Sequence, residues 1–240
     1  MYNTQSGYQI KFEYGLEGIK TLFDFTDIFI IVDILSFSTC VEIATSNDAK
    51  VYPFQWANEK AQEYSKEIDA ILASKRNSAD SFSLSQSSLL KIPKGFKIVL
   101  PSPNGSTLSL ETNNKLTIAG CLRNAKAVAE YANKYGKNIT VIASGEKWEN
   151  NNTRFAVEDL IGAGAIISEL KGSLSPEGEI AKIVFENKKE NLLQTLKNCS
   201  SGQELILKGF ESDIDLSAQL NISSCVPVLH EQRYYEKIII

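Results

Sequence analysis

The sequence predicts an α/β protein built around a largely parallel (mixed) sheet. Short apolar runs bounded by turn residues alternate with segments of helical period, which is the pattern of a sheet covered by helices on both faces. A chain of 240 residues, 43% of them hydrophobic, is long enough to bury its own core. We expect one compact unit over residues 1–240; the alternative is a sheet core at 1–171 with a helical layer at 172–240.

Eight short apolar segments have the length and composition of strands. They are Tyr8–Glu13, Ile28–Asp33, Lys50–Phe54, Ala70–Ala73, Lys97–Leu100, Leu116–Ala119, Ile139–Ala143 and, as a last strand, Tyr235–Ile240. Helical period predicts helices between them and through most of the last third. These helices are Ser38–Ser46, Ala57–Lys66, Ser106–Leu110, Asn124–Tyr135 and Phe155–Leu170, followed by one that starts at Ser175-Pro176 and two that Cys199–Gly202 separates.

The serine-rich stretch Ser74–Ser88 carries no regular period. It is predicted to be a long loop over one edge of the sheet and is a candidate lid.

Composition and missing motifs exclude several classes of protein. A net charge of −4 gives no electrostatic footprint for nucleic acid. No leader-like start and no apolar stretch of membrane-spanning length are present, so we expect a cytoplasmic protein. The four scattered cysteines predict reduced core thiols, and the single histidine, His230, excludes a multi-histidine metal site. No Gly-x-Ser-x-Gly, Cys-x5-Arg or Walker motif occurs, which disfavours standard esterases, cysteine phosphatases and P-loop enzymes.

Ligands of open α/β sheets bind beyond the carboxyl ends of the strands, and three such places carry unusual polar residues. At the first, a buried strand delivers Asp33, which suits a hard cation or an attack on phosphorus. Ser38 and Thr39 follow at a helix start and suit an anion. The structural alternative is equally strong, because Thr39 and Glu42 fit a capping box.

The second place is the turn Pro103-Asn104-Gly105-Ser106-Thr107, which leads from a strand into a helix. A glycine there lets successive amides point into one concavity, and the neighbouring side chains add donors suited to phosphate or sulfonate. The alternative is an ordinary turn, since Pro-Asn-Gly is common in turns.

The third place contains Glu146 after a strand and Glu158-Asp159 at the start of an apolar helix. Adjacent carboxylates at such a helix start suggest that it faces a cation such as Mg²⁺. The alternative is local: acidic residues favour the helix dipole, and Arg154 with Glu158 has the spacing of an ion pair.

Together these motifs resemble those of the 2-phosphosulfolactate phosphatase family, in the family's order over nearly the whole chain. The motifs are Val32–Leu35, Ser38-Thr39, Pro103–Ser106, Cys121–Ala125, Gly145-Glu146, Val157–Leu160 with Gly162–Gly164, Asp215 and Val226-Pro227. The resemblance implies a three-layer α/β/α fold. It also implies Mg²⁺-dependent hydrolysis of 2-phosphosulfolactate to sulfolactate and phosphate, a step of coenzyme M synthesis. Independently of the resemblance, a homodimer is the expected assembly, because it is the commonest one for a soluble enzyme.

The resemblance also implies roles for individual residues. Asp33 would be the central carboxylate, as nucleophile or metal ligand, and Glu146, Glu158 and Asp159 would complete the Mg²⁺ site. Asn104, Gly105, Ser106 and Thr107 would cradle the phosphoryl group opposite Ser38 and Thr39. Arg123 and Arg154 would meet the carboxylate or sulfonate.

One departure from the family bears on function. Where the family often has an arginine after the leucine of its first motif, this chain has Ser36. The departure predicts a missing positive charge beside Asp33, and hence a different small phosphoester as substrate or weaker transition-state stabilisation. The competing hypotheses are a binding or regulatory relative that keeps the anion pocket without catalysis, and a purely structural role for Asp33, Asn104 and Glu158.

Overall fold

The structure is a computed structural model that describes residues 2–76, 81–113 and 115–236. Within these residues nine strands form one mixed sheet in the order β1-β7-β2-β6-β10-β11-β3-β5-β4. The strands are β1 Ile10–Tyr14, β2 Ile28–Val32, β3 Lys50–Phe54, β4 Ile71–Leu72, β5 Lys97–Pro101, β6 Leu116–Gly120, β7 Ile139–Ala143, β10 Pro227–His230 and β11 Arg233–Glu236. The predicted α/β class with a largely parallel sheet is confirmed.

Two parallel sets of strands make up this sheet. In one set β1, β7, β2 and β6 are parallel neighbours, and in the other β3, β5 and β4 are. The antiparallel hairpin β10–β11 lies between the sets, next to β6 on one side and β3 on the other. The last residues of the described chain therefore complete the middle of the sheet. A division of the chain at residue 171 would separate these two strands from the rest of their sheet.

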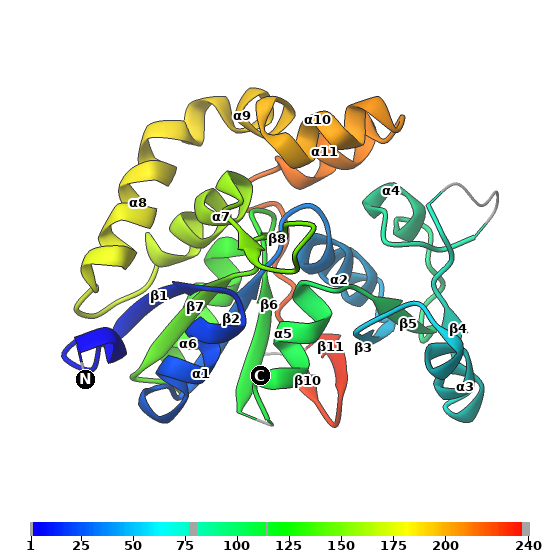
Figure 1. The fold of residues 1–240 in the computed structure, drawn as a ribbon, viewed down its shortest axis with the longest axis horizontal. Coiled ribbons are helices and arrows are strands. Elements are labelled where there is room, and N and C mark those ends of the chain that lie inside the picture. The colour runs from blue at the N-terminus through cyan, green and yellow to red at the C-terminus, as the bar shows by residue number, and fades with distance from the viewer. Residues whose placement is uncertain (1, 77–80, 114, 237–240) are drawn as a thin grey trace.

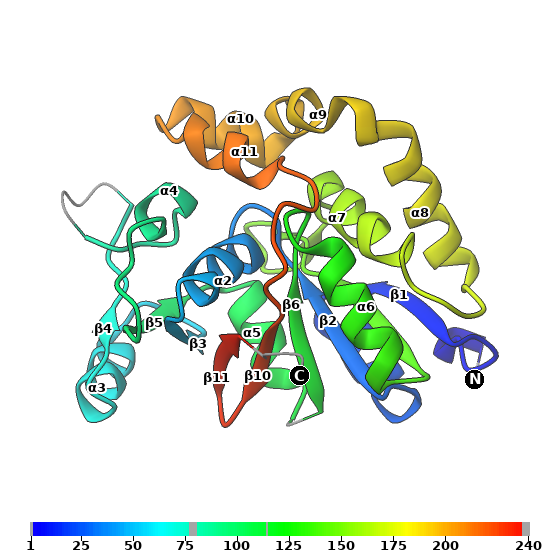
Figure 2. The ribbon, with the colours of Figure 1, turned by 180° about the vertical axis from the view of Figure 1, so that it is seen from behind.

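Helices cover both faces of the sheet (Figures 1 and 2). The helices of the described residues are α1 Gly15–Leu22, α2 Phe37–Ser46, α3 Glu59–Glu67, α4 Gln86–Leu89, α5 Gly105–Glu111, α6 Ala125–Tyr135, α7 Val157–Ile167, α8 Pro176–Lys188, α9 Leu192–Asn198, α10 Ser200–Leu207 and α11 Glu211–Ser217. Short 3₁₀ turns at η1 Tyr2–Thr4, η2 Phe23–Phe25 and η3 Lys189–Asn191 and the hairpin of β8 Glu146–Lys147 with β9 Thr153–Arg154 complete the described elements.

Side-chain alternation along β2 shows why two helical layers are needed. Ile28, Ile30 and Val32 pack with residues of α6 and α7 in the largest core cluster. Phe29 and Ile31 point to the opposite face and pack against α1 and α5. A strand that is apolar at every position is buried on both faces, as parallel strands are.

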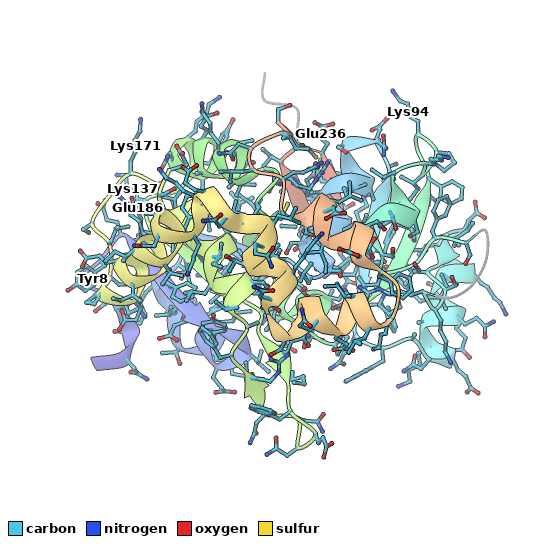
Figure 3. All side chains as sticks on the ribbon, turned by 90° about the horizontal axis from the view of Figure 1, so that it is seen from above. Tyr8, Lys94, Lys137, Lys171, Glu186 and Glu236 are labelled. Atoms are coloured by element: carbon cyan, nitrogen blue, oxygen red, sulfur yellow. The ribbon has the colours of Figure 1, made fainter. Side chains whose placement is uncertain are left out.

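The helical segment α8–α11 crosses from the β1 side of the molecule to the carboxyl ends of the central strands (Figure 3). Ser175 starts it as predicted, because its hydroxyl accepts a hydrogen bond from the Gly178 amide at 3.1 Å and Pro176 takes the first helical position. Cys199 alone separates α9 from α10; the other residues of the predicted break, through Gly202, form the first turn of α10. This arrangement places α10 over the ends of the strands.

Other differences from the predicted elements have local causes. Helix α1 was missed because Gly15 and Gly18 are poor helix formers, although Ile19 and Leu22 bury one face of it. The predicted loop 74–88 ends in the short helix α4, and its residues 77–80 lie outside the described part. The predicted last strand starts two residues early, at Arg233, and residues 237–240 of that prediction lie outside the described part.

Candidate active site

Asp33 directly follows β2 and is held from two sides. Its Oδ1 accepts the Phe37 amide at 3.1 Å, and its Oδ2 accepts the Gly105 amide at 2.9 Å. The Ser38 hydroxyl accepts the Asp33 amide at 2.7 Å and donates to the Ile31 carbonyl. Asp33 is 6% exposed, so a buried carboxylate with both oxygens hydrogen-bonded lies at the end of β2.

The loop after β5 brings Asn104 and Gly105 to the same point. A Cβ on Gly105 would lie 2.8 Å from Asp33 Oδ2 and would overlap the Phe37 ring, so only glycine allows this approach. The Asn104 amide nitrogen donates to Glu146 Oε2 at 2.9 Å. Asn104 Oδ1 is buried and has no partner among the described residues.

Behind Asp33, Asp159 links two strand ends. Its Oδ1 accepts the Ile34 amide at 2.8 Å and its Oδ2 accepts the Gly145 amide at 2.9 Å. Both Asp159 and its neighbour Glu158 are 3% exposed at the start of α7. Asp159 therefore fixes the loops that carry Asp33 and Glu146, and this use of both oxygens gives it a positioning role that the sequence did not reveal.

These carboxyl groups repel one another in a poorly solvated place. Burial, opposed in part by main-chain amides, raises the pKa of Asp33 to about 6. Burial, together with the charge of Asp33, raises the pKa of Glu146 to about 7. Burial and the charges of Asp33 and Glu158 also raise the pKa of Asp159 well above its usual range. Perturbed carboxyl groups gathered at one cavity are a common mark of a functional site.

A cavity of about 180 Å³ opens beside Asp33, Asn104 and Glu146. Its remaining walls are Leu35, Ser36, Arg76, Leu84, Ser102, Pro103, Ser201, Glu204 and Leu205. A larger hollow of about 610 Å³ lies near Tyr14, Asn151 and Phe155, but none of the predicted site residues line it. The smaller cavity is the candidate active site because the fixed carboxylates face it.

The oxygen atoms at this cavity suit a hard divalent cation that is bound partly by the protein and partly by oxygens of a ligand and water. Within the described residues no three His, Cys, Asp or Glu groups are arranged to hold a metal by themselves. Magnesium usually takes one or two carboxylates plus substrate and water oxygens, so a complete protein cage is not required. Asp33 and Glu146 line the cavity, and the unpartnered Asn104 Oδ1 is a further hard oxygen beside Glu146.

Arg76 is the functional candidate that the sequence did not reveal. It belongs to the serine-rich stretch, yet its Nη2 donates to Ser36 Oγ at 2.6 Å. Arg76 lines the same cavity as Asp33, so a segment distant in the sequence brings a positive charge to the place where Ser36 stands instead of the family's arginine. The one signal available from the sequence was an arginine in a polar stretch without period.

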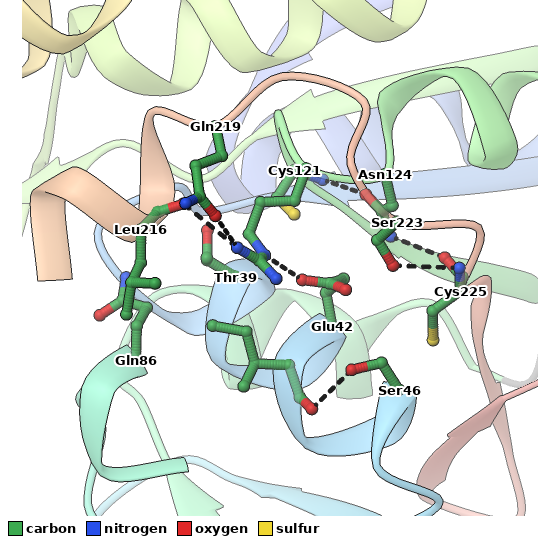
Figure 4. A network of polar contacts seen from close by, with 12 residues as sticks. Thr39, Glu42, Ser46, Gln86, Cys121, Asn124, Leu216, Gln219, Ser223 and Cys225 are labelled. Carbon is green, nitrogen blue, oxygen red and sulfur yellow. Dashed lines mark hydrogen bonds and ion pairs between the residues drawn. The ribbon is translucent and has the colours of Figure 1, made fainter. Parts of the chain in front are cut away.

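Arg123, predicted to meet the substrate, has other partners. Its Nε donates to Glu42 Oε2 at 2.5 Å, and its Nη1 donates to the side chain of Gln219. Arg123 is 8% exposed and Glu42 is fully buried, in a polar network that joins α2 to the segment after α11 (Figure 4). Because Arg123 is not on the wall of the cavity, this geometry gives it a structural ion pair in place of the predicted substrate contact.

Several hydroxyls predicted to bind phosphate donate to the main chain. Thr39 donates to the Ile34 carbonyl at 2.9 Å, and Ser106 donates to the Leu100 carbonyl at 2.8 Å. Thr107 lies 3.5 Å from the Ser102 carbonyl, and the Gly105 amide is taken by Asp33. These groups therefore stabilise the loops around the cavity. Their hydrogens are donated to oxygens of the protein, whereas the prediction had them donated to a phosphate.

Arg154 lies across the small hairpin from Glu146, not on the cavity wall. The two residues are direct partners in the β8–β9 pairing, and the Arg154 guanidinium lies 5.8 Å from the Trp148 ring centre. Its positive charge lowers the pKa of Glu146 and opposes the stronger effect of burial. His230 ends β10 beside a different cavity, and all four cysteines are buried free thiols, as predicted.

The raised pKa values predict that the metal-free protein loses stability as pH rises from about 4 to about 7. In that window the folded state keeps protons on Asp33 and Glu146 that the unfolded state has released, so a higher pH favours unfolding. The expected change is on the order of 1 to 3 kcal/mol. Thermal unfolding in chelator, compared with the double variant Asp33→Asn/Glu146→Gln, measures it. A pH dependence that is the same in both proteins would contradict the assignment.

The chain matches a family model described as 2-phosphosulpholactate phosphatase over residues 16–232. A protein of Carboxydothermus hydrogenoformans named "Probable 2-phosphosulfolactate phosphatase" is 33% identical over 210 residues, covering 85% of this chain and 86% of the relative. The "2-phosphosulfolactate phosphatase" of Methanothermobacter thermautotrophicus is 29% identical over 206 residues, covering 85% and 87%. A Thermotoga maritima relative, again named "Probable 2-phosphosulfolactate phosphatase", is 31% identical over 208 residues, covering 83% and 88%.

Proposed function

This chain belongs to the 2-phosphosulfolactate phosphatase family, and from that membership and the site geometry we propose that it hydrolyses 2-phosphosulfolactate to sulfolactate and phosphate. The observation that carries the proposal is the Asp33 carboxylate, fixed by the first amides of α2 and α5 at the wall of a small cavity that also holds Glu146 and Glu204. Such preorganisation suits an attack that tolerates little misplacement.

In the reaction, the bond between phosphorus and the substrate's C2 oxygen breaks, and a water oxygen becomes bonded to phosphorus. The proton that water loses is taken up by the released alkoxide. With a pKa of about 6, Asp33 is mostly ionised near pH 7.5 and is competent to attack phosphorus or to orient the water. Asn104 holds Glu146 beside it through its amide hydrogen bond.

We propose Mg²⁺ as the cofactor, held by Asp33 and Glu146, with Asn104 Oδ1 as a further oxygen and Glu158 as a buried negative charge nearby. When bound, the cation would screen the negative charge of the phosphoryl oxygens. Repulsion among the carboxyl groups supports this proposal, because each of them raises the pKa of another. Asp159 then keeps the two loops in register from behind the site.

Phosphate release tests the function and the cofactor together. We expect release from 2-phosphosulfolactate with Mg²⁺ and at least about a 100-fold loss in chelator, because the carboxylates would then repel the phosphoryl group. Mg²⁺ alone should also raise the melting temperature above pH 7. Ligand-dependent stabilisation without phosphate release from any small phosphoester would instead favour the non-catalytic anion-binding relative.

The described residues contain no helix long and apolar enough to cross a membrane. A cytoplasmic location, a homodimer, a place in coenzyme M synthesis and the absence of nucleic-acid binding stay predictions of the sequence. Buried free thiols support the location, since a reducing compartment keeps such cysteines unpaired.

A further inference from the structure

The candidate active site must hold a ligand with several negative charges in a cavity whose charged wall residues are mostly acidic. Asp33, Glu146 and Glu204 all line it, and Arg76 is the one lysine or arginine among the described residues on its wall. The substrate named by the family carries a carboxylate and a sulfonate besides its phosphoryl ester. These two non-reacting anions need a cationic partner if binding is to be favourable.

Arg76 is held in place, and among the described residues no acidic side chain neutralises it. Its Nε donates to the Leu84 carbonyl at 2.7 Å and its Nη2 donates to Ser36 Oγ at 2.6 Å. Its guanidinium carbon also lies 5.6 Å from the Phe210 ring centre. Among the described residues no carboxylate lies within ion-pair distance of it, although a guanidinium has five N–H donors. Charge and donors are left for a ligand.

The part of the serine-rich stretch that Arg76 contacts, next to Leu84, is anchored to a helix above the site. The Asp213 carboxylate accepts the Ser85 hydroxyl and the Ser87 amide, both at 2.9 Å, and Gln86 donates to the Ser217 hydroxyl at 2.8 Å. These buried contacts tie the described part of the serine-rich stretch to α11. Arg76 is thus presented to the cavity on a fixed support, as specific recognition requires.

A second donor stands on the same wall. Ser201, in the first turn of α10, is 5% exposed, and its hydroxyl has no partner among the described residues. A buried hydroxyl without a hydrogen-bond partner is unfavourable unless a bound ligand supplies that partner. Glu204, one turn later, is paired with Lys208, which offsets its negative charge.

We infer that Arg76, with the Ser201 hydroxyl as a second donor, binds a non-reacting anionic group of the substrate, the carboxylate or the sulfonate. The inference rests on the proposed function and adds a specificity-determining residue to it. A planar guanidinium fork suits such multi-oxygen anions better than an ammonium group does. Asp33 acts on the phosphoryl group of the substrate, while Arg76 recognises the non-reacting anionic group at its other end.

The test combines four variants, one of them Ser201→Ala, with three substrates. Arg76→Gln removes the charge, Arg76→Lys keeps it without the fork, and Lys75→Gln removes the charge of the exposed neighbour, which does not line this cavity. The substrates are 2-phosphosulfolactate, 2-phospholactate without the sulfonate, and phosphorylated isethionate without the carboxylate. Phosphate release gives kcat and KM for each pair.

Arg76→Gln should lower kcat/KM for 2-phosphosulfolactate about 10- to 100-fold, mainly through KM. Arg76→Lys should lose less, Lys75→Gln less than about twofold, and Ser201→Ala a few-fold. For whichever shortened substrate lacks the group that Arg76 binds, the loss should shrink to about threefold or less, which identifies that group. An equal loss on all three substrates, or no loss on any, would overturn the inference.

A binding measurement tests the role of Arg76 separately from the proposed phosphatase activity. Should the unaltered protein release no phosphate, calorimetry with sulfolactate still tests Arg76, because sulfolactate carries both non-reacting anions. Binding that is kept in Lys75→Gln and lost in Arg76→Gln would support the inference without the phosphatase. Equal binding by both variants, or no binding by the unaltered protein, would overturn it.

Discussion

The variant Asp33→Asn is expected to release phosphate about 10³-fold more slowly than the unaltered protein, or slower, because it removes the group that attacks phosphorus or orients water. The loss should appear in kcat, since the amide keeps the size of the side chain and the loops on both sides remain. Phosphate release under saturating 2-phosphosulfolactate and Mg²⁺ measures it. Retention of more than a tenth of the rate would contradict the role of Asp33.

The fold of this variant should survive, which makes the rate interpretable. An amide accepts through only one oxygen, so one of the two main-chain donors, Phe37 or Gly105, loses its partner. Against this, the change removes a buried negative charge whose ionisation the surroundings disfavour, as the raised pKa of Asp33 shows. We expect a melting temperature at pH 8 close to or above that of the unaltered protein.

A matched control is available outside the cavity. Asp24 is an exposed carboxylate in η2, and none of the described cavity residues contacts it through a hydrogen bond or ion pair. Asp24→Asn makes the same chemical change without touching the site, so its activity should stay within about twofold of the unaltered protein. An equal loss in both variants would point to a general effect on the protein.

The sequence predicted two strands to the residue, both with buried centres. Lys50–Phe54 and Ile139–Ala143 have the bounds that the structure gives them, because turn residues flank each run. The hairpin strand Pro227–His230 was missed, since a short segment that opens with proline resembles a turn. Its place between β6 and β3 depends on long-range pairing that local patterns do not encode.

The site was predictable in its carboxylates but not in its hydroxyls or cations. Asp33 and Glu146 follow strands whose carboxyl ends meet at one edge, and the structure places both on one cavity. For Thr39 and Ser106, sequence does not tell a hydroxyl that binds a ligand from one that donates to a carbonyl of its own loop. Arg76 was missed because its contact with Ser36 spans 40 residues of chain.

Arg123→Gln is expected to destabilise the folded protein by about 3 to 5 kcal/mol, because it leaves Glu42 as a buried charge without its cation. Glu42 is fully buried, and its Oε1 already lacks a partner among the described residues. Urea unfolding at pH 7 measures the loss. The double variant Arg123→Met/Glu42→Gln removes both charges and should recover most of the stability, since the main penalty of the single change is the stranded carboxylate.

The same variants decide between the two roles considered for Arg123. A structural ion pair predicts that the folded fraction of Arg123→Gln binds 2-phosphosulfolactate with an unchanged KM, because Arg123 is not on the cavity wall. Substrate binding by Arg123 predicts the reverse, with KM raised by about tenfold or more and stability nearly unchanged. Arg76→Gln should show that second pattern, so the two arginines, measured side by side, assign substrate charge recognition to one segment of the chain.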